Sequence, residues 1–183
     1  GAQKYKTEGL NSEVSGVLAY DAKLPMSKIN QNKNKINFFT PKLSFRYAPG
    51  HMRNIQDDDL KLSYSNAFLL NKNAEPDIIE EGESIATGFE ISSYELDDGI
   101  PGDKNYSLSL AQVQSFKENT SIPSKSSLNQ KASDLVGEAF IKIGENFNIQ
   151  NEFSLDNNFN DINYNDLEAN LILGNTSFNL NYL

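Results

Sequence analysis

Two short polar runs hold residue types that catalysis or metal binding requires. His51 is the only histidine of the chain, and the three carboxylates of Asp57–Asp59 follow it. A catalytic or metal-binding histidine needs partner ligands at a suitable spacing, and the chain has neither a second histidine nor a cysteine. Three adjacent carboxylates can bind a divalent cation, but such a run is more typical of a solvated turn. We therefore predict that this stretch is a connection and not a reactive cluster.

A second stretch begins like a calcium-binding loop. Asp156, Asn158 and Asn160 occupy the first, third and fifth positions of the pattern. The pattern then fails, because Asp161 stands where the sharp turn needs glycine and Leu167 stands where a bidentate glutamate is needed. The stretch is better interpreted as the loop of a β-hairpin.

The remaining acidic pairs give no support for an enzyme. Glu80–Glu81 and Asp97–Asp98 lie in turn-rich connections, where nothing would hold them in a dry, shaped pocket. The chain has no G-x-S-x-G, phosphate-binding or H-E-x-x-H motif. We predict no catalytic residue, no cofactor and no metal site.

The composition narrows the class of protein. The chain has 183 residues, 38% of them hydrophobic, and a net charge of −9. An acidic chain of this kind is atypical of nucleic-acid binding, which usually requires a basic face. No run of about 18 apolar residues is present, which argues against transmembrane helices. This composition does not exclude a transmembrane barrel, where only alternate residues meet lipid.

Apolar and polar residues alternate along most of the chain, which predicts about nine β-strands. Several of these runs span roughly 8–12 residues, the length that a tilted strand needs to cross a bilayer. Each run keeps one polar face, which suits a wall with lipid on one side and water on the other. The runs with shared apolar faces are residues 14–20, 43–47, 60–68, 85–91, 106–116, 135–143, 149–155, 167–173 and 178–182.

The connections between these runs differ in length. Residues 21–35, 71–82 and 117–131 are predicted to be long polar loops, while residues 144–147 and 174–176 are short. Outer-membrane barrels alternate short turns with long loops, but here the alternation is only partial, because residues 48–59 are not short. We predict an all-β fold, an antiparallel up-and-down transmembrane β-barrel segment with about nine strands of a larger barrel. An antiparallel β-meander with variable loops stays open as the alternative.

The stretch from residue 42 to residue 68 illustrates the two predicted faces. We expect one set to face lipid, namely Leu43, Phe45, Tyr47, Leu60, Leu62, Tyr64 and Phe68. We expect the alternate set to face a lumen, namely Lys42, Ser44, Arg46, Lys61, Ser63 and Ser65. The segment between them, with His51, is expected to be a solvated hairpin connection on the periplasmic side.

Several segments of the sequence also resemble a known protein family. The segments that carry the resemblance are "DAKLPM", "FFTPKLSFRYAPGHMRNIQDDDLKLSYSNAFLLNKN", "DIIEEGESIATGFE", "SLSLAQVQSFKENTSIPSKSSLNQKASDLVGE" and "FSLDNNFNDINYNDLEANL". They resemble the barrel of the lipopolysaccharide (LPS) assembly outer-membrane protein family, LptD, also called OstA or Imp, in its alphaproteobacterial branch. The resemblance covers the chain from about residue 14 to its end and carries no catalytic motif.

The resemblance implies a large antiparallel barrel, integral to the outer membrane of Gram-negative bacteria, that inserts LPS into the outer leaflet. It implies a plug lipoprotein of the LptE type inside the barrel, contact with outer-membrane lipids, and periplasmic bridge proteins that bind an N-terminal jellyroll. Residues 1–183 are expected to be an internal part of the C-terminal barrel domain, without the jellyroll and the strands of the lateral gate.

Charged residues on the predicted lumen face are the candidate contacts to LPS or to the partner. They are Lys42, Arg46, Lys61, Glu138 and Lys142, of which Lys42 and Arg46 are the best candidates for anions. The alternative is that these side chains only keep the lumen hydrated and make no specific contact. Two other functions stay open, a passive porin-like outer-membrane barrel and a soluble β-rich binding domain.

Overall fold

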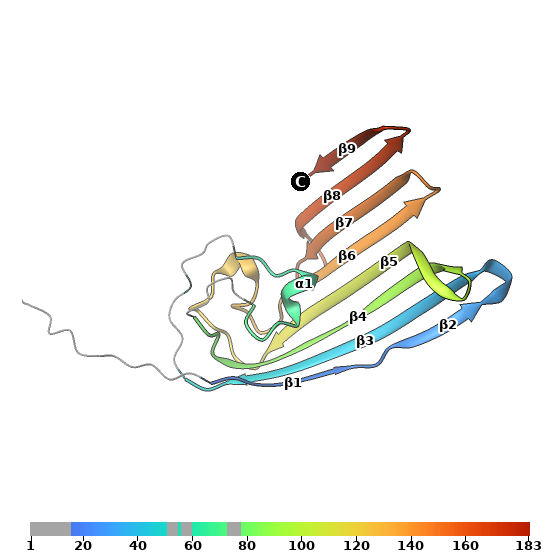
Figure 1. Ribbon diagram of the computed structural model, residues 1–183. Helices are drawn as coiled ribbons and strands as arrows, with labels where there is room; N and C mark the ends of the chain where they lie inside the picture. Colours follow the sequence, from blue (N-terminus) through green and yellow to red (C-terminus); the bar gives the residue numbers. More distant parts are fainter. Residues whose placement is uncertain (1–15, 51–54, 56–59, 73–77) are drawn as a thin grey trace, which may run out of the picture.

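The computed structural model describes residues 16–50, 55, 60–72 and 78–183 of the chain. These residues form one antiparallel sheet, a single short α-helix and two 3₁₀ turns, Gln31–Lys33 and Ser124–Ser126 (Figure 1). The elements are β1 (Leu18–Lys23), β2 (Met26–Asn30), β3 (Lys35–Ala48), α1 (Tyr64–Ala67), β4 (Gly82–Asp97), β5 (Ile100–Ser115), β6 (Leu135–Ile143), β7 (Phe147–Leu155), β8 (Ile162–Leu173) and β9 (Thr176–Tyr182). The predicted all-β class and the number of strands are confirmed.

The strands follow the chain in space. Their order is β1-β3-β4-β5-β6-β7-β8-β9, and each neighbouring pair is antiparallel. β2 also pairs with β3, in line with β1, so the two form one interrupted strand along the same edge. The interruption falls at Pro25, which has no N–H to donate to a ladder. This up-and-down order is that of a barrel segment whose sheet is not closed.

The connections sort by length to the two ends of the sheet. The turns that follow β2, β4, β6 and β8 are short and lie at one end, while the connections 49–81, 116–134 and 156–161 lie at the other (Figure 1). The two-residue turn between β4 and β5 places Asp98 (φ 49°) and Gly99 (φ +81°) in the left-handed region, as the Asp-Gly sequence favours. The expectation of a long loop over residues 21–35 is wrong, because most of this stretch lies in β1 and β2.

Residues 60–68 do not form the predicted strand. Residues 60–63 lead into α1, whose start is capped because the Ser63 backbone N–H donates to Asn66 Oδ1 at 2.9 Å. Without this strand, β3 and β4 become sequence neighbours, and the alternation of short turns and long connections becomes complete. The connection with His51 is therefore not a hairpin turn, and His51 and Asp57–Asp59 lie outside the described residues.

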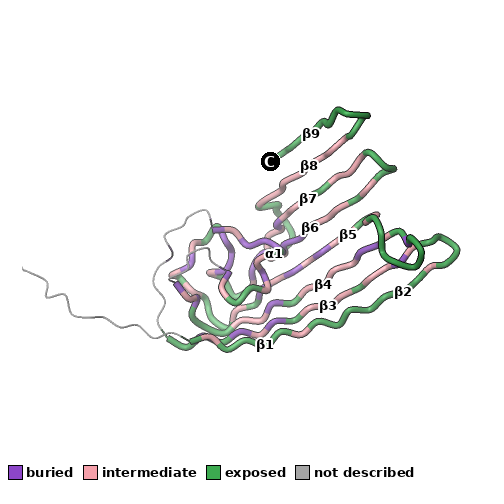
Figure 2. The backbone as a smooth tube through the Cα atoms, in the orientation of Figure 1, coloured by how far each residue is buried: buried purple, intermediate pink, exposed green. Residues whose placement is uncertain are grey.

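The two faces of the sheet differ as the sequence predicts. Directly paired residues share a face, so the pairs Leu43–Thr87 and Phe89–Leu110 belong to the same surface, which is apolar and open. The opposite surface carries Ser44 and Arg46 and is covered near the long connections. We call these surfaces the outer and the inner face. Figure 2 shows the alternation of buried and more open positions toward the end of β3, and the full exposure of β9.

The hydrophobic core lies on the inner face, between the sheet and the two longest connections. Its members are Ile55, Leu60, Leu62, Tyr64, Ala67, Ile78, Ala86, Ala111, Val113, Ile122, Leu128 and Val136. Leu60, Leu62 and Tyr64 are therefore buried against the inner face, and the expectation that they face lipid is wrong. Their period-two pattern comes from an irregular segment that packs one side on the sheet. Among the described residues, no helix is long and apolar enough to cross a membrane.

Candidate lumen wall and its folded connection

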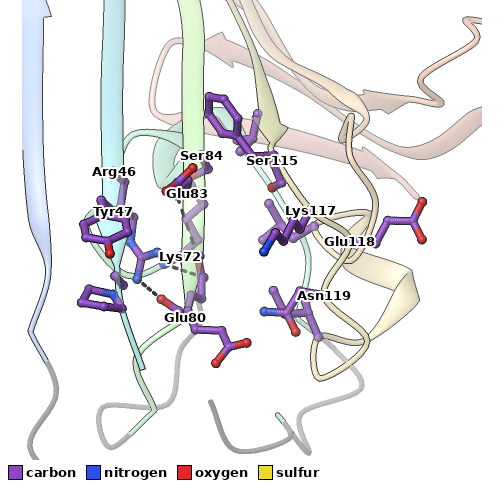
Figure 3. A pocket seen from close by; sticks show the side chains of 18 of the residues that line it. Arg46, Tyr47, Lys72, Glu80, Glu83, Ser84, Ser115, Lys117, Glu118 and Asn119 are labelled. Carbon is purple, nitrogen blue, oxygen red and sulfur yellow. Dashed lines mark hydrogen bonds and ion pairs between the residues drawn. The ribbon is translucent and has the colours of Figure 1, made fainter. Parts of the chain in front are cut away.

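The β3–β4 connection is held to the inner face by Arg46. We call residues 60–72 and 78–81 of this connection the strap. Arg46 lies on β3, is only 3% exposed, and donates from Nε to the Leu70 carbonyl at 2.6 Å. A second guanidinium nitrogen donates to the Glu80 carbonyl. Because arginine presents several donors in a rigid fork, one side chain joins both parts of the strap to β3 (Figure 3).

Lys72 and Glu80 form a buried ion pair beside Arg46. Glu80 Oε1 accepts from the Lys72 backbone N–H at 3.0 Å, and Glu80 Oε2 lies 3.9 Å from Lys72 Nζ. Burial lowers the pKa of Lys72, and attraction to Glu80 opposes that lowering. These residues border a cavity of about 350 Å³ at the long-connection end, shown in Figure 3 with Lys117 opposite. Arg46, Lys72 and Glu80 therefore hold the strap against β3 on this side of the cavity.

Lys42 joins the strap to the sheet a second time. Its Nζ lies 3.4 Å from Glu90 Oε2 and 5.0 Å from the centre of the Tyr64 ring. The ammonium also lies 5.8 Å from the centre of the Phe68 ring. A cation over an aromatic face is attracted by the negative face of the ring. Lys42 thus lies on the inner face, in the direction that the alternation predicts, and it contacts the strap.

The strap packs closely on the inner face at Gly88, and we call this position the seat. A Cβ built at Gly88 would lie 2.2 Å from the Leu110 carbonyl oxygen and 2.9 Å from Cζ of Phe68. No other residue leaves room for the Phe68 ring at this position, since the nearest atom belongs to the backbone of β5. Ala86 and Ala111 extend the same smooth surface beneath α1. Sequence patterns did not identify this seat, because a glycine in a strand can mark a bulge, a bend or the close approach of another group.

Lys61 links the strap to β8. Its Nζ lies 3.3 Å from the centre of the Tyr164 ring, and Tyr164 belongs to the inner face because it pairs with Ser154. The prediction that Lys61 sits on a strand is wrong, although its ammonium does lie against the inner face. The strap therefore contacts three strands, namely β3 at Arg46, β4 at Gly88 and β8 through Lys61.

Glu138 and Lys142 lie on β6 and face the inner side, in the direction that the alternation predicts. Lys142 Nζ pairs with Asp103 Oδ2 at 2.6 Å near the short-turn end. Glu138 borders a polar cavity of about 570 Å³ together with Glu152, Asp166 and Tyr64. The structure thus separates the five predicted contacts into three that hold the strap and two that lie farther along the open wall.

The calcium-like stretch is a hairpin loop, as predicted. Asp156 Oδ1 accepts from the backbone N–H groups of Asn160 at 2.7 Å and Asp161 at 3.3 Å. The carboxylate therefore closes the β7–β8 turn through its own backbone. Within residues 16–50, 55, 60–72 and 78–183, no group of three or more histidine, cysteine, aspartate or glutamate side chains is arranged to hold a metal ion.

Three residues of this inner wall were not identified from the sequence. Glu152 lies directly opposite Glu138, and Asp166 lies directly opposite Glu152, so their proximity depends on strand register. Tyr64 was assigned to the wrong surface. A period-two reading that fixed the β6–β8 register would have placed the two carboxylates beside Glu138.

A family model described as "LptD: LPS transport system D" matches residues 3–183. The match spans nearly the whole chain and agrees with the resemblance drawn from the sequence segments. It does not discriminate between branches, so the alphaproteobacterial type stays a prediction. No curated protein matches the chain.

Proposed function

Because this chain belongs to the LptD family and takes part in LPS transport and assembly at the outer membrane, we propose that its sheet is a section of the translocon barrel that inserts LPS into the outer leaflet. Residues 1–183 are then an internal part of the C-terminal barrel domain. The jellyroll and the gate strands lie elsewhere in the protein.

The main observation in support of this proposal is the apolar outer face. Large apolar side chains are open on it, including Leu43 at 43% exposure and Tyr106 at the same value. Contiguous apolar surface of this kind is unfavourable in water and favourable against acyl chains. The strands β3, β4 and β5 have 14, 16 and 16 residues, enough to cross a bilayer while tilted.

The open edges support the same proposal. β1 and β9 each have a neighbour on one side only. Unpaired backbone groups at a sheet edge are costly in lipid, so a membrane sheet must close on further strands. We place such strands beside β1 and β9, which makes the present sheet an integral part of a larger barrel.

The sidedness follows from the lengths of the connections. Outer-membrane barrels keep short turns on the periplasmic side and long loops outside. Connections 49–81 and 116–134 are then extracellular, which replaces the periplasmic position expected for the segment with His51. The strap folds from that side back onto the inner face.

The inner face suits partners that are polar. Ser107, Glu138 and Gln150 border its open cavity, and residues of this kind stay hydrated or bind polar ligands. We propose that the LPS saccharide and a plug lipoprotein of the LptE type occupy this lumen, with the bridge proteins bound through the N-terminal domain. Lys142 and Glu138 are the predicted contacts that remain beside the lumen, while Lys42, Arg46 and Lys61 act on the strap. The section contributes no catalytic step.

Photocrosslinking in the reconstituted complex tests this function. A photoreactive amino acid at Lys142 or Gln150 on the inner face should crosslink to LPS during transport. At Leu108 on the outer face it should crosslink mainly to acyl chains of membrane lipids. LPS crosslinks at none of the inner positions, in a complex that transports LPS, would contradict the proposal.

A passive pore is the second candidate, because the inner face has a polar cavity. The strap opposes it, since α1 packs on β5 and β6 and covers part of the wall. Planar-bilayer conductance separates the two functions. A porin would conduct steadily without LPS partners, whereas the proposed translocon section should leave the closed barrel poorly conducting. The third possibility, a soluble β-rich domain, would require the outer face to be covered and the protein to stay folded without detergent.

A further inference from the structure

The β4–β5 hairpin ends in a tip that reaches the inner face at the short-turn end of the sheet. Pairing with β3 stops at Glu95 and pairing with β6 stops at Tyr106, so between these residues the two strands pair only with each other. The register shifts twice between Ser93 and Leu96. Irregularities of this kind bend a hairpin, and Figure 1 shows the start of β5 curling at this end of the sheet. We call residues 97–103 the tip.

Two contacts of unequal strength hold the tip. On one side, the Leu96 backbone N–H donates to the Asn34 carbonyl at 2.9 Å, and Leu96 is only 8% exposed. On the other side, Lys142 Nζ pairs with Asp103 Oδ2 at 2.6 Å, and the Asp103 side chain is 72% exposed. A single exposed ion pair contributes little to stability. The tip is therefore held firmly beside β3 and weakly beside β6.

Asp103 is the carboxylate in direct contact with the Lys142 ammonium. Glu95 and Glu145 also attract this ammonium, but at longer range. Lys142 lies on the inner face, in the uncovered part of β6. Displacement of Asp103 would therefore leave an ammonium on the lumen wall that can receive another anion.

A second ammonium lies on the same part of the inner face. Lys104 Nζ lies 5.8 Å from the centre of the Phe140 ring and 5.9 Å from the centre of the Tyr94 ring. Phe140 and Lys142 are two residues apart on β6, so they project to the same face about 7 Å from each other along the strand. In the part of the chain that the structure describes, no carboxylate forms an ion pair with Lys104.

This arrangement suits a phosphorylated sugar. Lysine binds phosphate as a compact point charge, and two ammonium groups are available here. The Phe140 ring lies beside both and offers an aromatic surface to a sugar ring. Phe140 and Lys104 also border the polar cavity of about 570 Å³, so the arrangement is open to the lumen.

We propose that the tip is a latch on an anion subsite at the short-turn end of the lumen. Asp103 occupies Lys142 in the absence of ligand, and the phosphate of a phosphorylated saccharide displaces it. The phosphate then binds Lys142 and Lys104, and the sugar ring packs against Phe140. The inference rests on the proposed function, which puts this end of the sheet on the periplasmic side, where LPS arrives.

Calorimetric titration of the complete protein, reconstituted in LPS-free nanodiscs, tests the subsite. The probes are a glucosamine disaccharide with two phosphate groups, the same disaccharide without phosphate, and inorganic phosphate. We expect the phosphorylated disaccharide to bind at least about tenfold more tightly than either of the others, because only it offers both a phosphate and a sugar ring. Lys142→Gln should abolish this preference.

Asp103→Asn separates a latch from a purely structural ion pair. If Asp103 competes with the phosphate, its removal should tighten binding of the phosphorylated disaccharide by about two- to fivefold, the factor that corresponds to an exposed ion pair. The matched control is Asp98→Asn, which removes a charge from the same tip and tolerates the positive φ of that position. It should leave the affinity unchanged. Unchanged or weaker binding in Asp103→Asn would overturn the latch.

A spin label at Ile100, which is 69% exposed, follows the tip directly once any cysteines elsewhere are replaced. The label should become more mobile when the phosphorylated disaccharide binds, and it should be equally mobile in Asp103→Asn without sugar. A label that stays unchanged on binding would overturn the latch.

The probes also decide what the subsite recognises. Equal binding of the two disaccharides would overturn the subsite, and inorganic phosphate that binds as tightly as the phosphorylated disaccharide would overturn its assignment to a saccharide. An unaltered protein that inserts LPS but shows no phosphate preference contradicts this inference alone, whereas failure of that protein to insert LPS contradicts the proposed function.

Discussion

The two faces of β3 reverse the usual relation between polarity and burial. Leu43 on the outer face is 43% exposed, while Arg46, three residues later on the inner face, is 3% exposed. In a water-soluble protein the apolar residue would be covered and the charged one open. Under the proposed function, lipid replaces water on the outer face, and the chain itself supplies hydrogen-bond partners on the inner face. The outer face therefore depends on its solvent, and the inner face depends on the strap.

The inner face itself divides into two regions. Between β3 and β6 it is covered by the strap and residues 116–134, and most of the hydrophobic core lies there. From β7 to β9 it is progressively open (Figure 2). We infer that the covered region provides stability, and that the open region, together with the uncovered part of β6 that carries Glu138 and Lys142, is where ligands and partners bind. Substitutions should accordingly affect folding in the first region and binding in the second.

The largest effect is expected at Arg46. Arg46→Ala leaves the Leu70 and Glu80 carbonyls without their donor and the Lys72–Glu80 pair without its neighbour. Breaking a buried charged network costs about 3–5 kcal/mol. The free energy of unfolding of the complete protein in urea and lipid measures this loss. Arg46→Lys, which keeps the charge but not the fork, should retain part of the stability. A loss below about 1 kcal/mol for Arg46→Ala would mean that the strap does not depend on this anchor.

A smaller loss is expected on the outer face, at Leu43. Leu43→Arg places a charge against acyl chains, which costs about 2–4 kcal/mol near the middle of the bilayer and less near its surface. The same unfolding measurement applies, with Leu43→Ile as the control. If Leu43→Arg is neutral, this position does not meet lipid.

Gly88 provides a test that is specific to the seat of the strap. Gly88→Ala forces a Cβ toward the backbone of β5 and the Phe68 ring, and overpacking of this kind costs about 1–3 kcal/mol. Protease susceptibility of the strap should rise together with the loss of stability. Gly102→Ala is the matched control, because its Cβ would meet nothing nearer than 3.7 Å. If Gly88→Ala and Gly102→Ala had equal effects, the close contact at Gly88 would not be what holds the strap in place.

The smallest effect is expected at Lys61. Lys61→Met removes the ammonium that lies over the Tyr164 ring while retaining the aliphatic stem. Cation–π contacts of partly exposed groups contribute about 0.5–1 kcal/mol. A double-mutant cycle with Tyr164→Leu isolates this contribution. A coupling energy near zero would show that the strap does not reach β8 in solution.

The sequence predicted the strand faces well and the strap poorly, for a physical reason. Leu43 and Arg46 could be assigned because period-two alternation survives whether the apolar side meets lipid or a core. The same pattern misplaced Tyr64, since an irregular segment that packs on a sheet also alternates. Gly88 and Glu152 acquire their roles only through contacts across strands, and single-chain periodicity does not contain register.

The alternation of environments along β3 is the most direct test of the central claim. The 183 residues contain no cysteine. Once any cysteines elsewhere in the complete protein are replaced, single cysteines at positions 42–45 and 47 can each carry a spin label in the protein reconstituted in lipid. We predict that labels at Leu43, Phe45 and Tyr47 are accessible to oxygen from the bilayer. Labels at Lys42 and Ser44 should be shielded from oxygen, as expected of an inner face. Equal oxygen accessibility at all five positions, or the reverse alternation, would contradict a lipid-facing outer surface.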